Sequence, residues 1–179
     1  MKINYKIKFR NFRDYMELRN ILSSRDTLLE NHNANYFDWT KILYTDLIIL
    51  GIILLLNILL NGSLVLLFFL IFSMSVTIAI FVMFLLFYLR YLKLRKSRYG
   101  KLLIDEDGII DISDYGYICG FTWDQLSLIV KGRFDTVIFS DFAFSLYINN
   151  DVSDEVVEKI KKYKKDLVFI DRSVIKKKK

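Results

Sequence analysis

Residues 47–89 read LIILGIILLLNILLNGSLVLLFFLIFSMSVTIAIFVMFLLFYL, which is 43 consecutive positions without Asp, Glu, Lys or Arg. As one α-helix this stretch would be about 65 Å long, at about 1.5 Å per residue. The hydrocarbon core of a bilayer is about 30 Å thick and takes about 20 residues per span. The stretch is therefore too long for one span and suits two, and Asn61-Gly62-Ser63 is its turn signal. We expect a transmembrane helical hairpin over residues 41–91, with the turn near 61–63.

The charges around the hairpin predict its orientation. Basic side chains crowd the end of the second helix: Arg90, Lys93, Arg95, Lys96, Arg98 and Lys101. The turn carries no charge, and basic flanks stay on the cytoplasmic side, so both termini are expected in the cytoplasm. The same six residues are candidate contacts for anionic lipid headgroups. A buried helical pair in a soluble protein is the alternative, whereas a secretory signal peptide has a shorter apolar run.

The segment before the hairpin, residues 1–40, is expected to supply a cytosolic strand and an amphipathic helix. Residues 2–10 alternate between apolar and polar side chains, which is the period of a half-buried strand. The apolar positions of this strand are Ile3, Tyr5, Ile7 and Phe9. Residues 11–23 follow with helical spacing. Because a lone strand is not stable, we expect it to pair with a sheet formed after the hairpin.

Residues 101–171 are expected to form a cytosolic, mostly antiparallel β domain, joined to the hairpin by a basic linker over 92–100. Short apolar runs read as strands at 101–104, 109–112, 117–122, 126–130, 136–140 and 144–148. Turn signals separate them at Asp107-Gly108, Tyr115-Gly116, Lys131-Gly132 and Asp141. A helix over 151–165 closes the sheet, followed by a short strand at 167–170 and a basic tail over 172–179. The chain is thus predicted to be an α+β membrane protein.

The acidic stretch Asp105-Glu106-Asp107-Gly108 can be read as a cation-binding loop or as a hairpin turn. A calcium loop of the EF-hand type needs a carboxylate at every second position and a bidentate Glu further on. Here Ile109 and Ile110 follow instead. Asp-Gly between apolar runs is a strong hairpin signal, because glycine reaches the positive φ of a type I′ turn. We predict a turn, with Gly108 as a structural residue.

The order of these parts resembles the YcxB-like bacterial membrane proteins. The likeness rests on two segments, IDEDGI at residues 104–109 and FTWDQL at residues 121–126. The resemblance implies a pleckstrin-homology-like (PH-like) cytosolic domain, in which Trp123 is a packing residue. It also implies a location in the bacterial cytoplasmic membrane and a non-enzymatic, membrane-tethered role.

Catalytic chemistry is not indicated by the residues. The chain has one cysteine, Cys119, and one histidine, His32, and it carries no Gly-rich phosphate loop and no nucleophile elbow. We therefore predict no catalytic, metal or cofactor-binding residues and expect the protein not to be an enzyme. The formal net charge of +6 is concentrated beside the membrane stretch, so we do not predict nucleic-acid binding.

Three functions are compatible with these features. The first is a membrane-tethered binding or regulatory module that presents the cytosolic domain to a protein partner. The second is a membrane immunity protein, which neutralises a membrane-active toxin or bacteriocin through its hairpin. The third is a homo-oligomeric membrane pore, whose partners are further copies of the chain. The first is preferred, and in all three the lipid bilayer is a partner.

Overall fold

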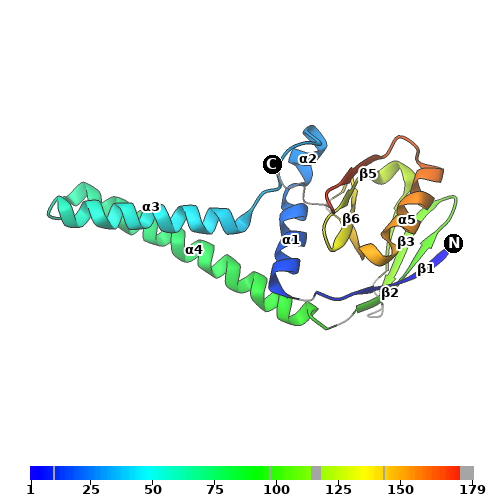
Figure 1. Ribbon diagram of the computed structural model, residues 1–179, viewed down its shortest axis with the longest axis horizontal. Coiled ribbons are helices and arrows are strands. Elements are labelled where there is room, and N and C mark those ends of the chain that lie inside the picture. The colour runs from blue at the N-terminus through cyan, green and yellow to red at the C-terminus, as the bar shows by residue number, and fades with distance from the viewer. Residues whose placement is uncertain (10, 97, 114–117, 143, 174–179) are drawn as a thin grey trace. The chain divides into compact units, whose positions relative to one another are not determined.

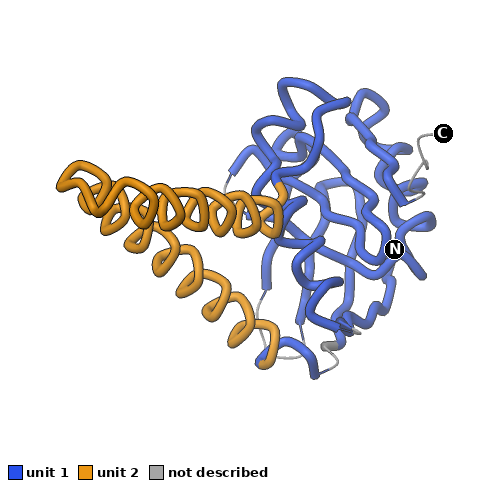
Figure 2. The backbone as a smooth tube through the Cα atoms, turned by 60° about the vertical axis from the view of Figure 1, so that its left-hand side comes forward, with its two compact units in different colours: residues 1–37, 93–179 blue, residues 38–92 orange. Residues whose placement is uncertain are grey.

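The computed structural model describes residues 1–9, 11–96, 98–113, 118–142 and 144–173, without the side chain of Arg98. The chain forms two compact units, residues 38–92 and residues 1–37 together with 93–179 (Figure 2). The predicted turn at Tyr115-Gly116 and the tail from residue 174 onward lie outside the described residues. The predicted α+β class is confirmed, because helices and two sheets are both present.

Residues 38–92 form a helical hairpin. Helix α3 spans Trp39–Leu59 and helix α4 spans Leu64–Leu94, close to the predicted helices at 41–60 and 64–91. Asp38 caps α3 by accepting the backbone N–H of Thr40 at 3.0 Å, so the helix begins two residues earlier than expected. Both helices are long and apolar enough to cross a membrane, and α3 buries none of its residues. At about 1.5 Å per residue α3 is about 31 Å long, which matches one bilayer core.

The hairpin turn and one polar contact hold the two helices together. Asn61 and Gly62 have φ values of +51° and +68°, and the N–H of Gly62 donates to the carbonyl oxygen of Asn57 at 2.9 Å. This left-handed backbone is accessible to Asn and Gly, which confirms the predicted turn. Between the helices, Thr77 Oγ1 donates to Asp46 Oδ2 at 2.6 Å. Polar side chains that hydrogen-bond across two apolar helices provide each other with the partner that an apolar environment lacks.

The first sheet of the other unit combines strands from both sides of the hairpin. It contains β1 (Lys2–Ile7), β2 (Arg98–Ile104), β3 (Gly108–Ser113) and β4 (Ile118–Thr122), in that order and antiparallel throughout. Strand β1 pairs with β2 so that Ile3 faces Leu102, and both side chains are buried. The prediction that the N-terminal strand pairs with a sheet formed after the hairpin is therefore confirmed.

The second sheet has the order β7-β6-β5-β8. Its strands are β5 (Leu126–Lys131), β6 (Asp135–Ser140), β7 (Ser145–Asn149) and β8 (Val168–Asp171). Strand β8 pairs with β5 in parallel, because α5 (Asn150–Tyr163) carries the chain back before β8 begins. The other elements are α1 (Phe12–Ser23), the unpredicted α2 (Arg25–Glu30) and a 3-10 turn, η1 (Trp123–Gln125).

The core of this unit lies on both faces of β6. Every residue of β6 is buried, so both faces of the strand are covered. Helix α1 packs on β6 with buried Leu18 and Ile21, and α5 packs on it with buried Val156 and Ile160. The two helices lie on opposite sides of the sheet (Figure 1). This arrangement explains the spacing of apolar residues along both helices.

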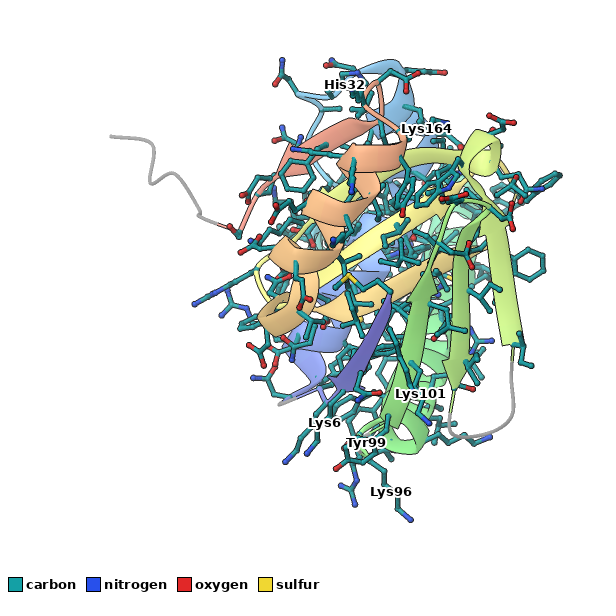
Figure 3. All side chains as sticks on the ribbon, turned by 90° about the vertical axis from the view of Figure 1, so that its right-hand side faces the viewer. Lys6, His32, Lys96, Tyr99, Lys101 and Lys164 are labelled. Atoms are coloured by element: carbon teal, nitrogen blue, oxygen red, sulfur yellow. The ribbon has the colours of Figure 1, made fainter. Side chains whose placement is uncertain are left out.

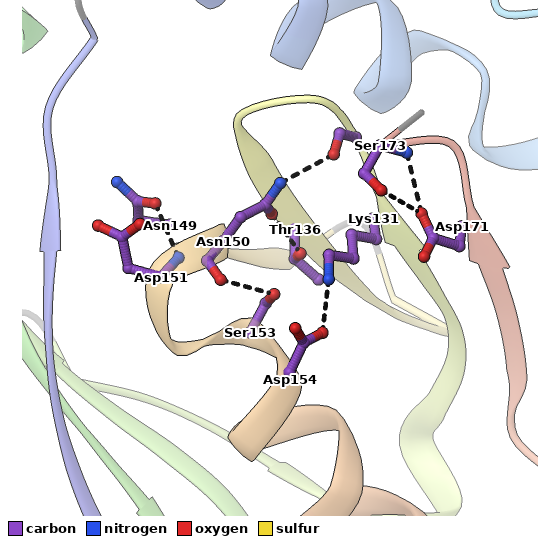
Figure 4. Close-up of polar contacts among 10 residues, drawn as sticks. Lys131, Thr136, Asn149, Asn150, Asp151, Ser153, Asp154, Asp171 and Ser173 are labelled. Atoms are coloured by element: carbon purple, nitrogen blue, oxygen red, sulfur yellow. Dashed lines mark hydrogen bonds and ion pairs between the residues drawn. The ribbon is translucent and has the colours of Figure 1, made fainter. Parts of the chain in front are cut away.

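Polar contacts fix the start of α5 against the sheet (Figure 4). Asn150 Oδ1 accepts from Thr136 Oγ1 at 2.8 Å, and Asn150 Nδ2 donates to the carbonyl oxygen of Gly132 at 2.9 Å. Lys131 forms an ion pair with Asp154 at 2.5 Å. Because the residues of this cluster satisfy one another across β5, β6 and α5, we assign the cluster a structural role.

Candidate functional site

The basic residues predicted to contact lipid lie at the end of α4 and along β2. Arg90 and Lys93 belong to the last turns of α4, Arg95 and Lys96 follow it, and Lys101 lies in β2. These five side chains are exposed, while that of Arg98 lies outside the described part. The two ion pairs found among the described residues, Arg25–Asp26 and Lys131–Asp154, involve none of them.

Strand β1 brings a further lysine, Lys6, close to these residues. The sequence predicted only that Lys6 lies on the polar face of its strand. Lys6 pairs with Tyr99 in the β1–β2 register, and its ammonium lies 5.2 Å from the centre of the Tyr99 ring. We call Lys6, Lys96, Tyr99 and Lys101 the basic strip. Lys6, Lys96 and Tyr99 gather at the end of the unit opposite His32 and Lys164 (Figure 3). The signal that could have found Lys6 is the β1 alternation combined with the pairing of β1 and β2.

The acidic stretch at residues 105–108 is a hairpin loop between β2 and β3. Asp105 Oδ1 accepts the backbone N–H groups of Asp107 and Gly108 at 3.0 and 3.2 Å, so this carboxylate caps the turn. Gly108 has a φ of +157° and already pairs with Thr122 of β4. The hairpin is confirmed. The predicted type I′ turn is wrong, because three residues, 105–107, connect the two strands. Gly108 is instead needed because a Cβ there would clash with the backbone of β4.

Trp123 clamps this hairpin loop to α5 and is half-buried. Its Nε1 donates to the carbonyl oxygen of Glu106 at 2.9 Å, and its ring stacks on Tyr163 with the ring centres 4.9 Å apart. Lys164 Nζ donates to the carbonyl oxygens of Trp123 and Leu126 at 2.9 and 2.6 Å. The contacts of Gly108 and Trp123 are thus structural, and neither residue belongs to the basic strip.

A pocket of about 430 Å³ opens between β1–β4 and β7. Its apolar and aromatic lining includes Tyr5, Ile7, Tyr99, Phe144, Leu146 and Tyr147. Its polar lining consists of Asp111, Ser113, Cys119 and Ser145. Sequence reasoning did not find this site, because its walls come from strands that are more than a hundred residues apart in the chain.

A hydrogen-bonded pair forms the polar end of the pocket. The hydroxyl of Tyr5 donates to Asp111 Oδ1 at 2.5 Å. Burial raises the pKa of the Asp111 carboxyl, and the hydrogen bond from Tyr5 opposes that rise. Burial and the charge of Asp111 also raise the pKa of the Cys119 thiol. Gly100 makes room for this pair, because a Cβ there would lie 2.4 Å from the Tyr5 ring.

No group of three or more His, Cys, Asp or Glu side chains suited to a metal ion occurs among the residues described. No protein-family model matches the chain, and the comparison with curated proteins gives no match.

Proposed function

We propose that the protein is a membrane-tethered, non-enzymatic module that holds a β domain at the cytoplasmic face of the bacterial membrane and presents it to a protein partner. The observation that carries the proposal is the place of the hairpin in the chain. Helices α3 and α4 lie between β1 and β2, and these two strands are direct partners in one sheet.

This topology supports an even number of membrane crossings. Strands β1 and β2 exchange backbone hydrogen bonds, so they must be on the same side of the membrane. A single crossing of residues 38–92 would place them on opposite sides and break the sheet. Two crossings are compatible with the lengths of α3 and α4 and with their exposed apolar side chains.

The basic strip supports contact with anionic headgroups. Lys96 and Lys101 follow the end of α4 within seven residues, and Lys6 joins them through the β1–β2 pairing. Each cation near an anionic surface contributes about 1 kcal/mol. Such a contact would fix the orientation of the β domain on the membrane as well as its distance from it.

A PH-like character of the domain is part of the proposal. It is supported by two mostly antiparallel sheets and by α5, which packs on β5, β6 and β7. In a sheet that is closed by a final helix, no strand follows that helix. Here one more strand, β8, follows α5 and pairs in parallel with β5.

Lysine acetylation in vesicles tests the lipid contact. The full chain is reconstituted in phosphatidylcholine alone or with added phosphatidylglycerol, and the acetylation rate of each lysine is measured by mass spectrometry. Lys6, Lys96 and Lys101 should react more slowly in the anionic vesicles, and salt should remove the difference. Lys165, exposed beyond α5, is the internal control and should react at the same rate in both. Equal rates at Lys6 and Lys101 in the two membranes would refute the contact.

Exchange of the hairpin tests the tethered module against the other two functions. Residues 38–92 are replaced by an unrelated two-span hairpin, and both chains are purified from native membranes in mild detergent. Capture of the same protein by both chains supports the tethered module. Loss of a secreted, membrane-active partner only in the exchanged chain would favour immunity. Ion conductance of vesicles that contain the wild-type chain, without any captured partner, would favour the pore.

A further inference from the structure

The pocket between β1–β4 and β7 has the size and lining of a small-molecule site. Its volume of about 430 Å³ lies within the range of about 300–1,000 Å³ that is typical of such sites. Its lining combines residues of both sheets, from β1–β4 and from β7. None of the three functions considered above makes use of it.

Two aromatic side chains of the pocket lining are exposed to solvent. Phe144 is 57% and Tyr99 51% exposed. Tyr5 and Tyr147 also line the pocket. Aromatic faces attract cations through the negative charge density of the ring face. The ammonium of Lys6 already uses the ring of Tyr99 in this way, at 5.2 Å from its centre.

Among the described residues that line the pocket, Asp111 is the one carboxylate, and none of these residues is a lysine, arginine or histidine. Tyr5 donates to Oδ1 of this carboxylate, while Oδ2 has no hydrogen-bond partner among the described residues. A carboxylate half-buried among aromatic rings is short of positive charge, because burial removes water from it without supplying a cation.

We propose that this pocket binds a small organic cation, a primary amine on an apolar or aromatic body. The ammonium group would donate to Asp111 Oδ2, and the body would pack against Phe144, Leu146 and Tyr147. An anion would be repelled by the carboxylate, and a neutral analogue would leave the carboxylate unpaired. This pocket is separate from the proposed lipid contact, so an experiment can refute one of the two proposals and leave the other intact.

Binding of 2-phenylethylamine to the full chain in mild detergent tests the proposal. Affinity is measured by calorimetry, and the labelling rate of Cys119 by a maleimide gives a second readout. Cys119 is the only cysteine of the chain and lines the pocket, so its labelling reports on this site alone. The amine should bind and slow the labelling, whereas 2-phenylethanol and 3-phenylpropanoate, which lack the positive charge, should bind at least about tenfold more weakly.

Two charge-matched variants locate the interaction. Asp111→Asn removes the carboxylate but keeps an acceptor for Tyr5, and should weaken amine binding about tenfold or more. Asp166→Asn removes the same charge at an exposed position outside the pocket, and should leave binding unchanged.

A third variant, Ser145→Phe, fills the pocket from β7 and keeps the carboxylate. It should abolish binding, and it keeps the proposal testable if Asp111→Asn fails to fold.

Three results would overturn the proposal. The first is the absence of both calorimetric binding and Cys119 protection by the amine in the wild-type chain. The second is equal binding of the amine and of 2-phenylethanol. The third is undiminished binding by a folded Asp111→Asn or Ser145→Phe variant.

Discussion

Replacing Gly108 by alanine should destabilise the β unit strongly. An ideal Cβ at this position would lie 2.0 Å from the carbonyl oxygen of Phe121 and 2.9 Å from the Cα of Thr122. Both are backbone atoms of β4, so no side-chain rotation can relieve the clash, and β3 has to move away from β4. Overpacking costs about 1–3 kcal/mol, and the φ of +157° adds backbone strain of about 1–3 kcal/mol. The expected loss is therefore about 2–6 kcal/mol.

Gly120→Ala is the matched control for this substitution. It lies on β4 in the same sheet, but a Cβ there would meet its nearest atom, on the Ile110 side chain, at 3.5 Å, which is ordinary contact. Its effect should stay below about 1 kcal/mol.

Thermal unfolding of the full chain in mild detergent provides the measurement. It is followed by the fluorescence of Trp123 in a Trp39→Phe background, because Trp123 bonds to the β2–β3 loop. The Gly108→Ala variant should lose about 4 °C or more in Tm, since each kcal/mol shifts the Tm of a domain by about 2–8 °C. A Gly108→Ala variant that melts with the wild type, or a Gly120→Ala variant that loses as much, would refute the reasoning.

Further predictions concern the buried acid Asp135 and the Trp123 clamp. Burial, together with the charges of Glu17 and Asp14, raises the pKa of Asp135 to about 7. A carboxyl whose pKa is higher in the folded state lowers stability above that pKa, by up to about 4 kcal/mol here, and the penalty disappears as the pH falls below about 4. Asp135→Asn should therefore raise the Tm at about pH 8 and leave it unchanged at about pH 4; an equal gain at both values would contradict this. Trp123→Ala should cost about 2–3 kcal/mol, less than a fully buried tryptophan, because the side chain is only half-buried; an unchanged Tm would show that the stacking on Tyr163 contributes nothing. Lys164→Met should cost about 1–3 kcal/mol in the same melt, because two carbonyl oxygens lose their donor; a loss limited to the few tenths of a kcal/mol of a surface substitution would exclude that role.

The elements of this fold were predictable from local patterns. The charge-free run predicted α3 and α4 to within three residues at each end, because a bilayer span sets a length. The alternation of Ile3, Tyr5 and Ile7 identified β1, and the instability of a lone strand identified its partner sheet. These predictions depend only on the spacing of apolar residues along the chain, so they require no knowledge of the tertiary structure.

The pocket and the parallel pairing of β8 could not be predicted in the same way. Asp111 reads in sequence as a polar interruption of a strand, and Tyr5 reads as one more apolar position. Their contact depends on the register of β1, β2 and β3, with Gly100 opposite both Tyr5 and Ser113. Helix α2 was missed because Arg25–Glu30 is too short to show a helical period.

The insertion of the hairpin between paired strands has a consequence for biogenesis. Strand β1 leaves the ribosome first, but its partner β2 follows only after residues 8–97 have been made, which takes on the order of 5–20 s at typical rates of synthesis. Throughout that delay the apolar face of β1 has no sheet to join. If the hairpin crosses a membrane, the sheet can close only when the chain between the strands has returned to the side from which it started. In the proposed topology, a nascent chain that crosses the membrane only once would keep β1 and β2 on opposite sides, and the first sheet could not close.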